Sequence, residues 1–308
     1  MSKYIIWSDA HFHDYTAYSE NGSRLQLCKE AIYKMVEYAK ENNINYLMFA
    51  GDLFHAKIKL PATVVNAIVE VFKELTAIHP EMIIYFITGN HCHIKNNIYG
   101  EEIKHSLSFL EEQFEFFKCV DNETISIGDD VWHGIPFYRY REHLYQSIED
   151  TVNRFKGPRN FALLHNHPDG QLNKYIPTEF IYEETLLFMF DFIFCGHSHQ
   201  HQQVQDNLVI VGSPIANSHL DENVSKKGFL VFDSDELTYE LIDLKFPKFV
   251  TVDEINESSE DYQRQKEKVL LTENIFDPSM SLEDMFINYW GEHSEDLELL
   301  EAGLSLIK

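Results

Sequence analysis

The sequence lacks the features that mark secreted and membrane proteins. Its four cysteines, Cys28, Cys92, Cys119 and Cys195, are widely spaced and form no CxxC pair, as expected for reduced thiols in a cytoplasm. No apolar run approaches the length of a membrane span. The opening "MSKYIIWSD" lacks the apolar stretch and the small-residue cleavage site of a signal peptide. We therefore expect a cytoplasmic protein.

Positive charge is also scarce. The chain has 25 Lys and Arg against 50 Asp and Glu, which gives a formal net charge of −25. Much of this excess lies in residues 253–302, where fifteen acidic residues stand against three basic ones. Such a balance argues against passive binding to nucleic acid. Carboxylates that bind metal ions are an exception, because the cation offsets their charge.

The apolar pattern predicts an α+β fold. Strand-like runs cover residues 3–8, 45–50 and 82–87, and helical spacing covers residues 25–40 and 64–78. After a polar helix at 141–155, further strand-like runs lie at 160–164, 191–195, 208–211, 228–232 and 238–242. This order fits two mixed β-sheets packed as a sandwich and flanked by helices, a four-layer αββα arrangement. A composition shift near residue 246 predicts that a first domain covers residues 1–245.

Polar residues of ligand type follow five of the strand-like runs. The stretch "FCGHSHQHQQ" alternates His197, His199 and His201, and alternation along a strand would let His197 and His199 point the same way. The full set comprises Asp9, His11, Asp52, Asn90, His91, His165, His197 and His199. Any one of them alone is better explained as a turn or loop residue. As a set, each directly after an apolar run, they predict a metal site at the strand-end loops.

The donor types indicate the metal and the chemistry. Carboxylate, imidazole and amide donors without a thiolate favour Mn²⁺, with Fe²⁺, Zn²⁺ and Mg²⁺ as alternatives, over a structural zinc. If one carboxylate is shared between two cations, the result is a two-metal site. Such a pair activates water and stabilises the entering and leaving oxygens of phosphoryl transfer.

The five motifs resemble those of the calcineurin-like metallophosphoesterases. They read "SDAHFH", "AGDLFH", "TGNH", "LLHNH" and "CGHSH", and the resemblance spans roughly residues 3–243. Four further stretches, "GDLFHAK", "LPATVVNAIVEVF", "HGIPFYR" and "GSPIANSHLDENVSKKGFLVFD", resemble one branch, the SbcD-type double-strand-break repair nucleases and their bacteriophage relatives. That branch implies a DNA exonuclease or endonuclease of DNA repair, recombination or phage DNA processing, in a bacterial or phage-infected cytoplasm.

The resemblance also implies a role for each motif residue. One metal would be held by Asp9, His11, Asp52 and His199, and the second by Asp52, Asn90, His165 and His197, with Asp52 as the bridge. His91 would donate to the phosphate or protonate the leaving oxygen, and His55 would lie near the scissile phosphate. Basic residues near the motif loops offer DNA contacts, although scattered solvated charges would look the same: Lys57, Lys59, Lys95, Arg139 and Arg141.

Three departures from the family pattern leave questions open. Cys92 stands where the family has an acid after "GNH", so the orientation and the pKa of His91 are undecided. His167 competes with His165 as a ligand, and His165 is preferred because it follows the strand directly. The flanking His13, His93 and His201 are expected to support the ligands or to be solvated.

The C-terminal region has a pattern of its own. Leu282, Met285, Phe286, Tyr289 and Trp290 have amphipathic helical spacing. The resemblance implies that residues 279–308 form a helical segment that docks on an SbcC-like ABC-type ATPase, with a homodimer in the complex. Packing on the chain's own core is the alternative. Residues 246–278 are short for the capping domain of that family, and we expect a reduced cap or a linker.

Two other functions remain open at this stage. The same metals would serve a phosphodiesterase or phosphatase that acts on a small molecule or a phosphoprotein, because the phosphoryl chemistry is common to all. A metal-free scaffold on the same fold is the alternative from another class. The intact ligand set argues against the scaffold.

Overall fold

The computed structural model describes residues 2–15, 23–57, 59–94, 98–154, 156–168, 180–181, 189–217 and 226–246. All of them belong to the first of two compact units, Met1–Phe249, and the second unit is Val250–Lys308. The predicted cap or linker, apart from Phe246, and the predicted C-terminal helical segment lie outside the described residues.

The first β-sheet contains the strands that lead to the first three motifs. Strands β1, β2, β3 and β4 run parallel, and β13 and β14 extend the sheet antiparallel beyond β1. In spatial order the strands are β14 (Thr238–Asp243), β13 (Gly228–Asp233), β1 (Lys3–Trp7), β2 (Tyr46–Phe49), β3 (Ile83–Phe86) and β4 (Phe117–Cys119). The carboxyl ends of β1, β2 and β3 therefore meet at one edge.

The second sheet contains the strands that lead to the last two motifs. Strands β6, β7, β10 and β12 run parallel, with β5 and β11 antiparallel at the two edges. In spatial order they are β11 (Gln202–Gln205), β12 (Leu208–Ile210), β10 (Phe192–Cys195), β7 (Arg159–Leu164), β6 (Asp130–Ile135) and β5 (Thr124–Ile127). A separate short pair joins β8 (His167–Pro168) and β9 (Phe180–Ile181).

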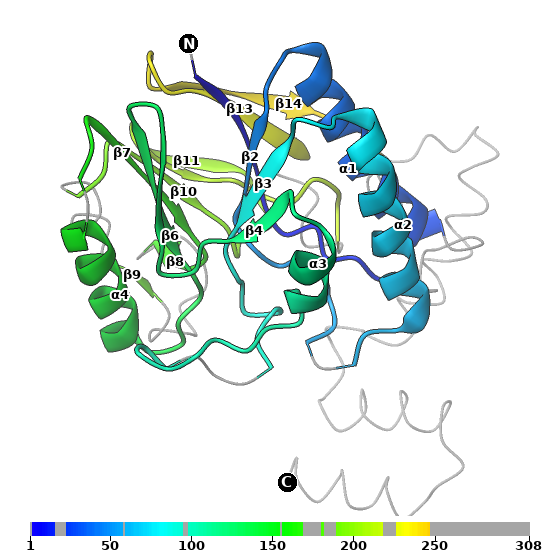
Figure 1. Cartoon of the computed structure of the whole chain (residues 1–308), viewed down its shortest axis with the longest axis horizontal. Helices are drawn as coiled ribbons and strands as arrows, with labels where there is room; N and C mark the ends of the chain where they lie inside the picture. The colour runs from blue at the N-terminus through cyan, green and yellow to red at the C-terminus, as the bar shows by residue number, and fades with distance from the viewer. Residues whose placement is uncertain are drawn as a thin grey trace, which may run out of the picture. The chain divides into compact units, whose positions relative to one another are not determined.

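Helices cover the outer faces of the two sheets (Figure 1). They are α1 (Ser23–Glu41), α2 (Ala62–Ile78), α3 (Ser108–Gln113) and α4 (Arg141–Arg154). In α1 the buried side chains recur every three or four residues from Arg24 to Ala39, so one face packs on the first sheet. Helix α4 packs on the second sheet. The predicted fold of two mixed sheets with flanking helices is confirmed.

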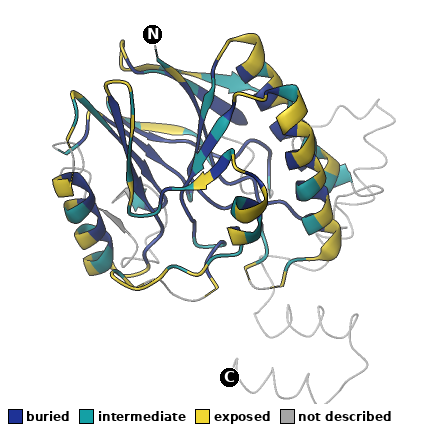
Figure 2. Ribbon diagram, viewed as in Figure 1, coloured by how far each residue is buried: buried dark blue, intermediate teal, exposed yellow. Residues whose placement is uncertain are grey.

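A central core between the sheets fixes their separation. It is rich in aromatic side chains: the ring of Trp132 lies 4.9 Å from that of Tyr4 and 5.1 Å from that of Phe161. Tyr4 belongs to the first sheet, and the other two rings belong to the second. Figure 2 shows the buried strands of this interior between helices whose outer faces are exposed.

Several of the described elements, among them α3, β4 and β11, were missing from the sequence-based prediction. Helix α3 has six residues, too few for a helical period to show. Strand β4 has three residues, and β11, "QQVQ", is mostly exposed and polar. Both strands exist because they pair with a neighbour, β4 with β3 and β11 with β12. Pairing with a neighbouring strand stabilises β4 and β11, although their own sequences give no strand pattern.

None of the four cysteines, all of which lie in the described ranges, forms a disulfide. In the part of the chain that the structure describes, no helix is long and apolar enough to cross a membrane.

A buried carboxylate joins the two sheets at the amino ends of their strands. Asp130 is fully buried and accepts hydrogen bonds from the Tyr4 hydroxyl and the Ser234 hydroxyl, each at 2.6 Å. The Nε atom of Arg159 lies 2.5 Å from the other Asp130 oxygen. The contact with Tyr4 links β6 to β1 and so crosses from one sheet to the other.

We predict that Asp130→Ala lowers the free energy of unfolding by about 1–3 kcal/mol, because the buried Tyr4 hydroxyl loses its acceptor and Arg159 keeps only Asp235 as a partner. Urea denaturation measures the loss. The exposed neighbour provides the control, and Asp129→Ala should change the free energy by less than about 0.5 kcal/mol. Equal losses for the two variants would contradict this role of Asp130.

Candidate metal centre

Four candidate ligands adopt left-handed backbone conformations where their strands end. The φ angles are 54° for Asp9, 45° for His11, 62° for Asp52 and 75° for His197. A non-glycine residue in this region costs roughly 1–2 kcal/mol, and such strain gathers at functional sites. His197 and His199 therefore lie in a loop after β10, and the strand alternation expected for them is wrong. The left-handed turn at His197 ends the strand.

The loops after β1 and β2 are hydrogen-bonded to each other. The Asp9 amide donates to the Gly51 carbonyl at 2.9 Å, and the His11 amide donates to the Asp52 carbonyl at 3.0 Å. A further bond joins the Phe12 amide to the Leu53 carbonyl at 2.7 Å. This pairing continues the β1–β2 register past the strands, so the first two motifs are held side by side.

The motif glycines allow the loops of the two sheets to approach closely. Gly51 has a φ of +95°, and a Cβ atom there would lie 2.6 Å from Nδ1 of His165 in the other sheet. A Cβ atom on Gly196 would lie 2.4 Å from the carbonyl oxygen of Ala50. Both distances are too short for a real contact, so a side chain at either position would push the two halves of the cluster apart.

The first group of ligand atoms comprises Asp9, His11 and His199. The Nε2 atoms of the two histidines are 3.0 Å apart, and Asp9 Oδ1 lies 3.6 Å from the His11 nitrogen and 4.0 Å from the His199 nitrogen. Asp9 Oδ2 accepts hydrogen bonds from Ser8 Oγ and the His197 amide at 2.5 and 3.0 Å. Oδ1 is buried and has no hydrogen-bond partner among the described residues. It faces the two imidazoles.

The second group comprises Asp52, His165 and His197, with Asn90 beside them. Asn90 Oδ1 lies 3.2 Å from His165 Nε2 and 2.9 Å from His197 Nδ1. Asp52 Oδ2 lies 3.3 Å from the same His165 nitrogen. His165 donates through Nδ1 to the Ala50 carbonyl. A histidine whose second nitrogen is fixed on a backbone carbonyl is the usual arrangement of a metal ligand.

Asp52 lies between the two groups. Its Oδ2 is 3.8 Å from His11 Nε2 in the first group and 3.3 Å from His165 Nε2 in the second. Its Oδ1 accepts from the backbone amide of His91 at 2.8 Å and lies 3.9 Å from Cys92 Sγ. One oxygen is thus held by the loop after β3, and the other faces both groups.

The cluster is strongly charged. Burial alone would raise the pKa of the Asp9 carboxyl, but His11, His165 and His199 outweigh burial and lower it. For Asp52, burial is likewise outweighed, mainly by His165, and the pKa is well below its usual value. Burial would lower the pKa of His165, but the Asp52 carboxylate raises it to about 9. The two carboxylates remain ionised and require positive charge beside them.

His91 is oriented by a backbone carbonyl. Its Nδ1 donates to the His55 carbonyl, so this nitrogen carries the hydrogen. Cys92, which replaces the acid of the family motif, is buried and points toward Asp52. Burial lowers the pKa of His91 although Asp52 opposes the shift. The rings of His11, His55 and His91 lie 4.8–5.3 Å apart, so His91 adjoins the first group.

The donor atoms fit divalent cations. Ligand atoms that share an ion at about 2.1 Å stand about 3.0–3.4 Å apart, and the distances in the second group are 2.9–3.3 Å. In the first group they are wider, at 3.0–4.0 Å, around the buried Asp9 oxygen that lacks a hydrogen bond in the described structure. All donors are nitrogen or oxygen. Three groups of described residues could hold a metal ion: the two above, with Asp52 between them, and a third of His11, His55 and His91 that shares His11 with the first.

The flanking histidines are held by hydrogen bonds. His13 donates through Nδ1 to the His11 carbonyl at 2.6 Å, and His201 Nδ1 lies 3.3 Å from the Val211 carbonyl. His167, the competitor of His165, packs its ring 4.6 Å from that of His197. The structure brings His165 to Asp52, and His167 belongs to neither group of ligand atoms.

A second layer of support around Thr88 had no signal in the sequence. The Thr88 amide and hydroxyl donate to Asp121 at 2.8 and 2.5 Å, and the hydroxyl lies 2.8 Å from His93 Nε2. Burial raises the pKa of Asp121 to about 6 and lowers that of His93 to about 3. Asp121 follows the short β4, which no periodicity revealed. Through Thr88 these residues hold the loop that carries Asn90.

The basic residues expected at DNA are scattered. Lys57, Lys59 and Arg139 are exposed, and Arg141 is half-buried. The charge of Lys57 adds to burial in lowering the pKa of His91, so this ammonium lies near the cluster. Lys95 falls in a gap between the described ranges.

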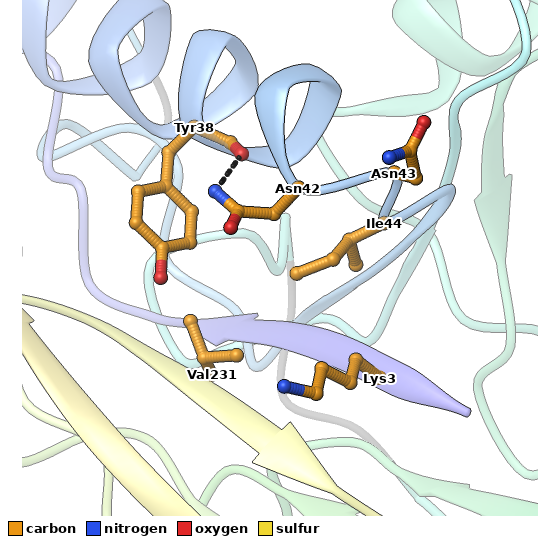
Figure 3. A pocket seen from close by; sticks show the side chains of 6 residues that line it. All are labelled: Lys3, Tyr38, Asn42, Asn43, Ile44 and Val231. Carbon is orange, nitrogen blue, oxygen red and sulfur yellow. Dashed lines mark hydrogen bonds between the residues drawn. The ribbon is translucent and has the colours of Figure 1, made fainter. Parts of the chain in front are cut away.

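A surface pocket elsewhere on the molecule lacks the chemistry of a catalytic site (Figure 3). Its lining residues are Lys3, Tyr38, Asn42, Asn43, Ile44 and Val231. They offer an ammonium, amides and a phenol, and neither a carboxylate nor an imidazole. Asn42 donates to the Tyr38 carbonyl at 2.9 Å. The ligand cluster is therefore the candidate site.

A two-sheet fold with Asp and His groups at its strand ends is the architecture of a metal-dependent phosphoesterase. The chain belongs to the calcineurin-like phosphoesterase family, whose model matches residues 3–201. Membership implies metal-dependent hydrolysis of phosphoesters. The matched range covers all the candidate ligands and ends at His201.

The chain is similar to solved structures at low sequence identity. TT1561 from Thermus thermophilus is 10% identical, over 79% of this chain and 99% of that one, with a TM-score of 0.48. A dimetal phosphatase from Danio rerio is 10% identical, over 75% of this chain and 91% of that one, with a TM-score of 0.45. No curated protein sequence matches. These comparisons do not single out the nuclease branch.

The close approach at Gly51 yields a prediction. Gly51→Ala should lower the free energy of unfolding by about 2–5 kcal/mol, because it adds a clash with the other sheet to the backbone strain. Gly128 has a φ of +62° and nothing within 4 Å of its Cβ position, so Gly128→Ala tests strain alone, about 1–2 kcal/mol. Urea denaturation measures both variants. A loss at Gly51 no larger than that at Gly128 would refute the close contact.

Proposed function

We propose that this protein is a metal-dependent DNA nuclease that hydrolyses phosphodiesters at a site for two divalent cations, with Mn²⁺ as the preferred metal. One observation carries the proposal: Asp52 lies between two groups of ligand atoms, and His91 adjoins the first of them. The first cation is assigned to Asp9, His11, Asp52 and His199. The second is assigned to Asp52, Asn90, His165 and His197. Asp52 would take part in holding both cations: its Oδ1 accepts from the His91 amide, and its Oδ2 faces both groups.

When bound, the two cations supply an activated water and stabilise charge on the phosphoryl oxygens. The chain's own residues orient the reaction. His91 keeps its Nδ1 hydrogen on the His55 carbonyl, so a proton for the leaving oxygen must come from Nε2 of the imidazolium. The Asp52 carboxylate accepts from the His91 amide and so fixes the backbone of this residue. We assign His91 as the proton donor and His55 as a contact to the phosphate.

The assignment of DNA as substrate is supported by the branch-specific motifs and by the residues around His91. His55 is half-buried with its ring 5.3 Å from that of His91, and the exposed Lys57 acts electrostatically on His91. We propose Lys57, Lys59, Lys95, Arg139 and Arg141 as contacts to the DNA backbone. Phosphodiesterase or phosphatase action on a small molecule or phosphoprotein uses the same metals, and substrate tests separate the two functions.

We also propose a partner. The apolar spacing of residues 282–290 and the resemblance to SbcD-type nucleases support docking of residues 279–308 on an SbcC-like ABC-type ATPase, with two nuclease subunits in the complex. This segment lies beyond the described residues. Deleting residues 279–308 should abolish co-purification with the ATPase and leave metal binding intact. A truncated protein that loses its metals would count against docking.

The bridging role of Asp52 predicts that Asp52→Ala loses both metals, since each group loses an oxygen. Inductively coupled plasma mass spectrometry after dialysis against Mn²⁺ gives the metal content, with two ions expected in the unaltered chain. His91→Ala serves as the control: it should keep both metals while turnover falls by about 10²–10⁴-fold. If Asp52→Ala retains two metals, the bridge is wrong. A chain that binds none unaltered would be the metal-free scaffold.

The substrate assignment predicts Mn²⁺-dependent degradation of DNA that EDTA abolishes. Labelled linear, circular and hairpin DNA should be cleaved, while phosphopeptides and cyclic nucleotides should be poor substrates. His91→Ala, purified by the same procedure, is the control: if it leaves the DNA intact, the activity does not come from a contaminating nuclease. Efficient hydrolysis of a phosphopeptide or cyclic nucleotide, with DNA left intact, would replace the nuclease function by the alternative.

A further inference from the structure

Buried side chains hold the backbone carbonyls of the first ligand group. The Asp9 carbonyl accepts from Asn217 Nδ2 at 3.3 Å, and the His11 carbonyl accepts from His13 Nδ1 at 2.6 Å. The His199 carbonyl accepts from Lys227 Nζ and from Ser213. None of these supporting side chains belongs to either ligand group.

One segment, residues 213–217, connects most of these contacts. Ser213 donates its amide to the His199 carbonyl at 3.1 Å, and its hydroxyl lies 2.7 Å from the Ile215 carbonyl and 3.2 Å from the His199 carbonyl. The Ala216 carbonyl accepts from the buried Arg24 of α1 at 2.5 Å. Lys227 Nζ lies 3.1 Å from the Ser213 hydroxyl. We call residues 213–217 together with Lys227 the bracket. It lies outside the range matched by the family model, which ends at residue 201.

The second ligand group is held by different residues. His165 rests on the carbonyls of Ala50 and Ile135, and the loop that carries Asn90 is held through Thr88. Among the contacts described for the bracket, the bonds to ligand residues reach only Asp9 and His199, both of the first group. The described supports of the two groups thus differ, although the His197 amide of the second group also donates to Asp9 Oδ2 of the first.

Lys227 is the bracket residue whose burial is costly. Its side chain is 3% exposed, and removing an ammonium from water is costly unless it gains good hydrogen bonds. Its partners are the His199 carbonyl and Ser213, and its own carbonyl accepts from the Leu244 amide at 2.9 Å at the edge of the first sheet. The adjacent Lys226 is exposed.

We infer that Lys227 is a positioning residue: it fixes the loop of His199 and thereby sets the affinity of the first metal group more than that of the second. The inference rests on the proposed function, because it takes the two groups as metal sites. Partners outside the ligand shell commonly change metal affinity by about 10–100-fold when they are replaced. Loss of Lys227 should thus weaken one of two metals.

The test compares Lys227→Met with Lys226→Met, which removes the same charge from an exposed neighbour. Mn²⁺ titration calorimetry of the full chain should show two sites in the unaltered protein and in Lys226→Met. In Lys227→Met one site should weaken by about 10–100-fold and the other should weaken less. Electron paramagnetic resonance at limiting Mn²⁺ should change from the signal of a coupled pair to that of isolated ions. Lys227→Arg should restore part of the lost affinity.

Failure of the positioning role and failure of the proposed function would give different results. Unchanged affinities in Lys227→Met, or equal weakening of both sites in a folded variant, would overturn the positioning role. An unaltered chain that binds no Mn²⁺ would overturn the proposed function itself. If circular dichroism shows that Lys227→Met does not fold, Ser213→Ala removes one bond to the His199 carbonyl and should weaken the same site to a smaller degree. Wild-type affinities in folded Ser213→Ala would then count against the bracket.

Discussion

Two ionised carboxylates buried at one edge of the sheets are the constraint on which the site depends. Asp9 and Asp52 are both shielded from water, and each repels the other. Imidazoles offset part of this charge, and the pKa of His165 rises to about 9 as a result. Bound cations would offset the rest, which is why a pocket made of acids and imidazoles suits divalent metals. The strained backbone at both aspartates is consistent with a site held in place by its surroundings.

The structural carboxylate and the candidate ligand groups lie at opposite ends of the strands. The amino ends of the strands carry a structural carboxylate, Asp130, whose partners Tyr4, Ser234 and Arg159 are all present. The carboxyl ends carry the ligand groups, where Asp9 Oδ1 is left without a hydrogen bond in the described structure. Both acids have one oxygen without a hydrogen bond in the described structure. That of Asp130 lies 2.5 Å from the Arg159 guanidinium, whereas that of Asp9 faces two imidazoles and is available to a cation.

The residues that indicate the family differ from those that bear on the substrate. The ligands at the strand ends define phosphoester chemistry, and the family model covers them all. The proposed substrate involves residues outside the candidate ligands: the ring of His55 lies 5.3 Å from that of His91, the charge of Lys57 lowers the pKa of His91, and Lys95 lies beyond the described ranges. Shared metals do not separate a nuclease from a phosphatase, because the chemical step is the same. The proposed DNA substrate therefore rests on motif resemblance and on the residues near His91.

The sequence by itself determined the fold class and the chemical types of the ligands, since apolar runs mark strands and the polar residues directly after them must lie at strand ends. Tertiary structure decided the rest. The distances from Asp52 to the two groups and the bond of His91 to the His55 carbonyl depend on contacts between distant segments. So does the burial of Lys227 beneath His199. Local periodicity carries no information about such pairings, because they are set by how the two sheets pack.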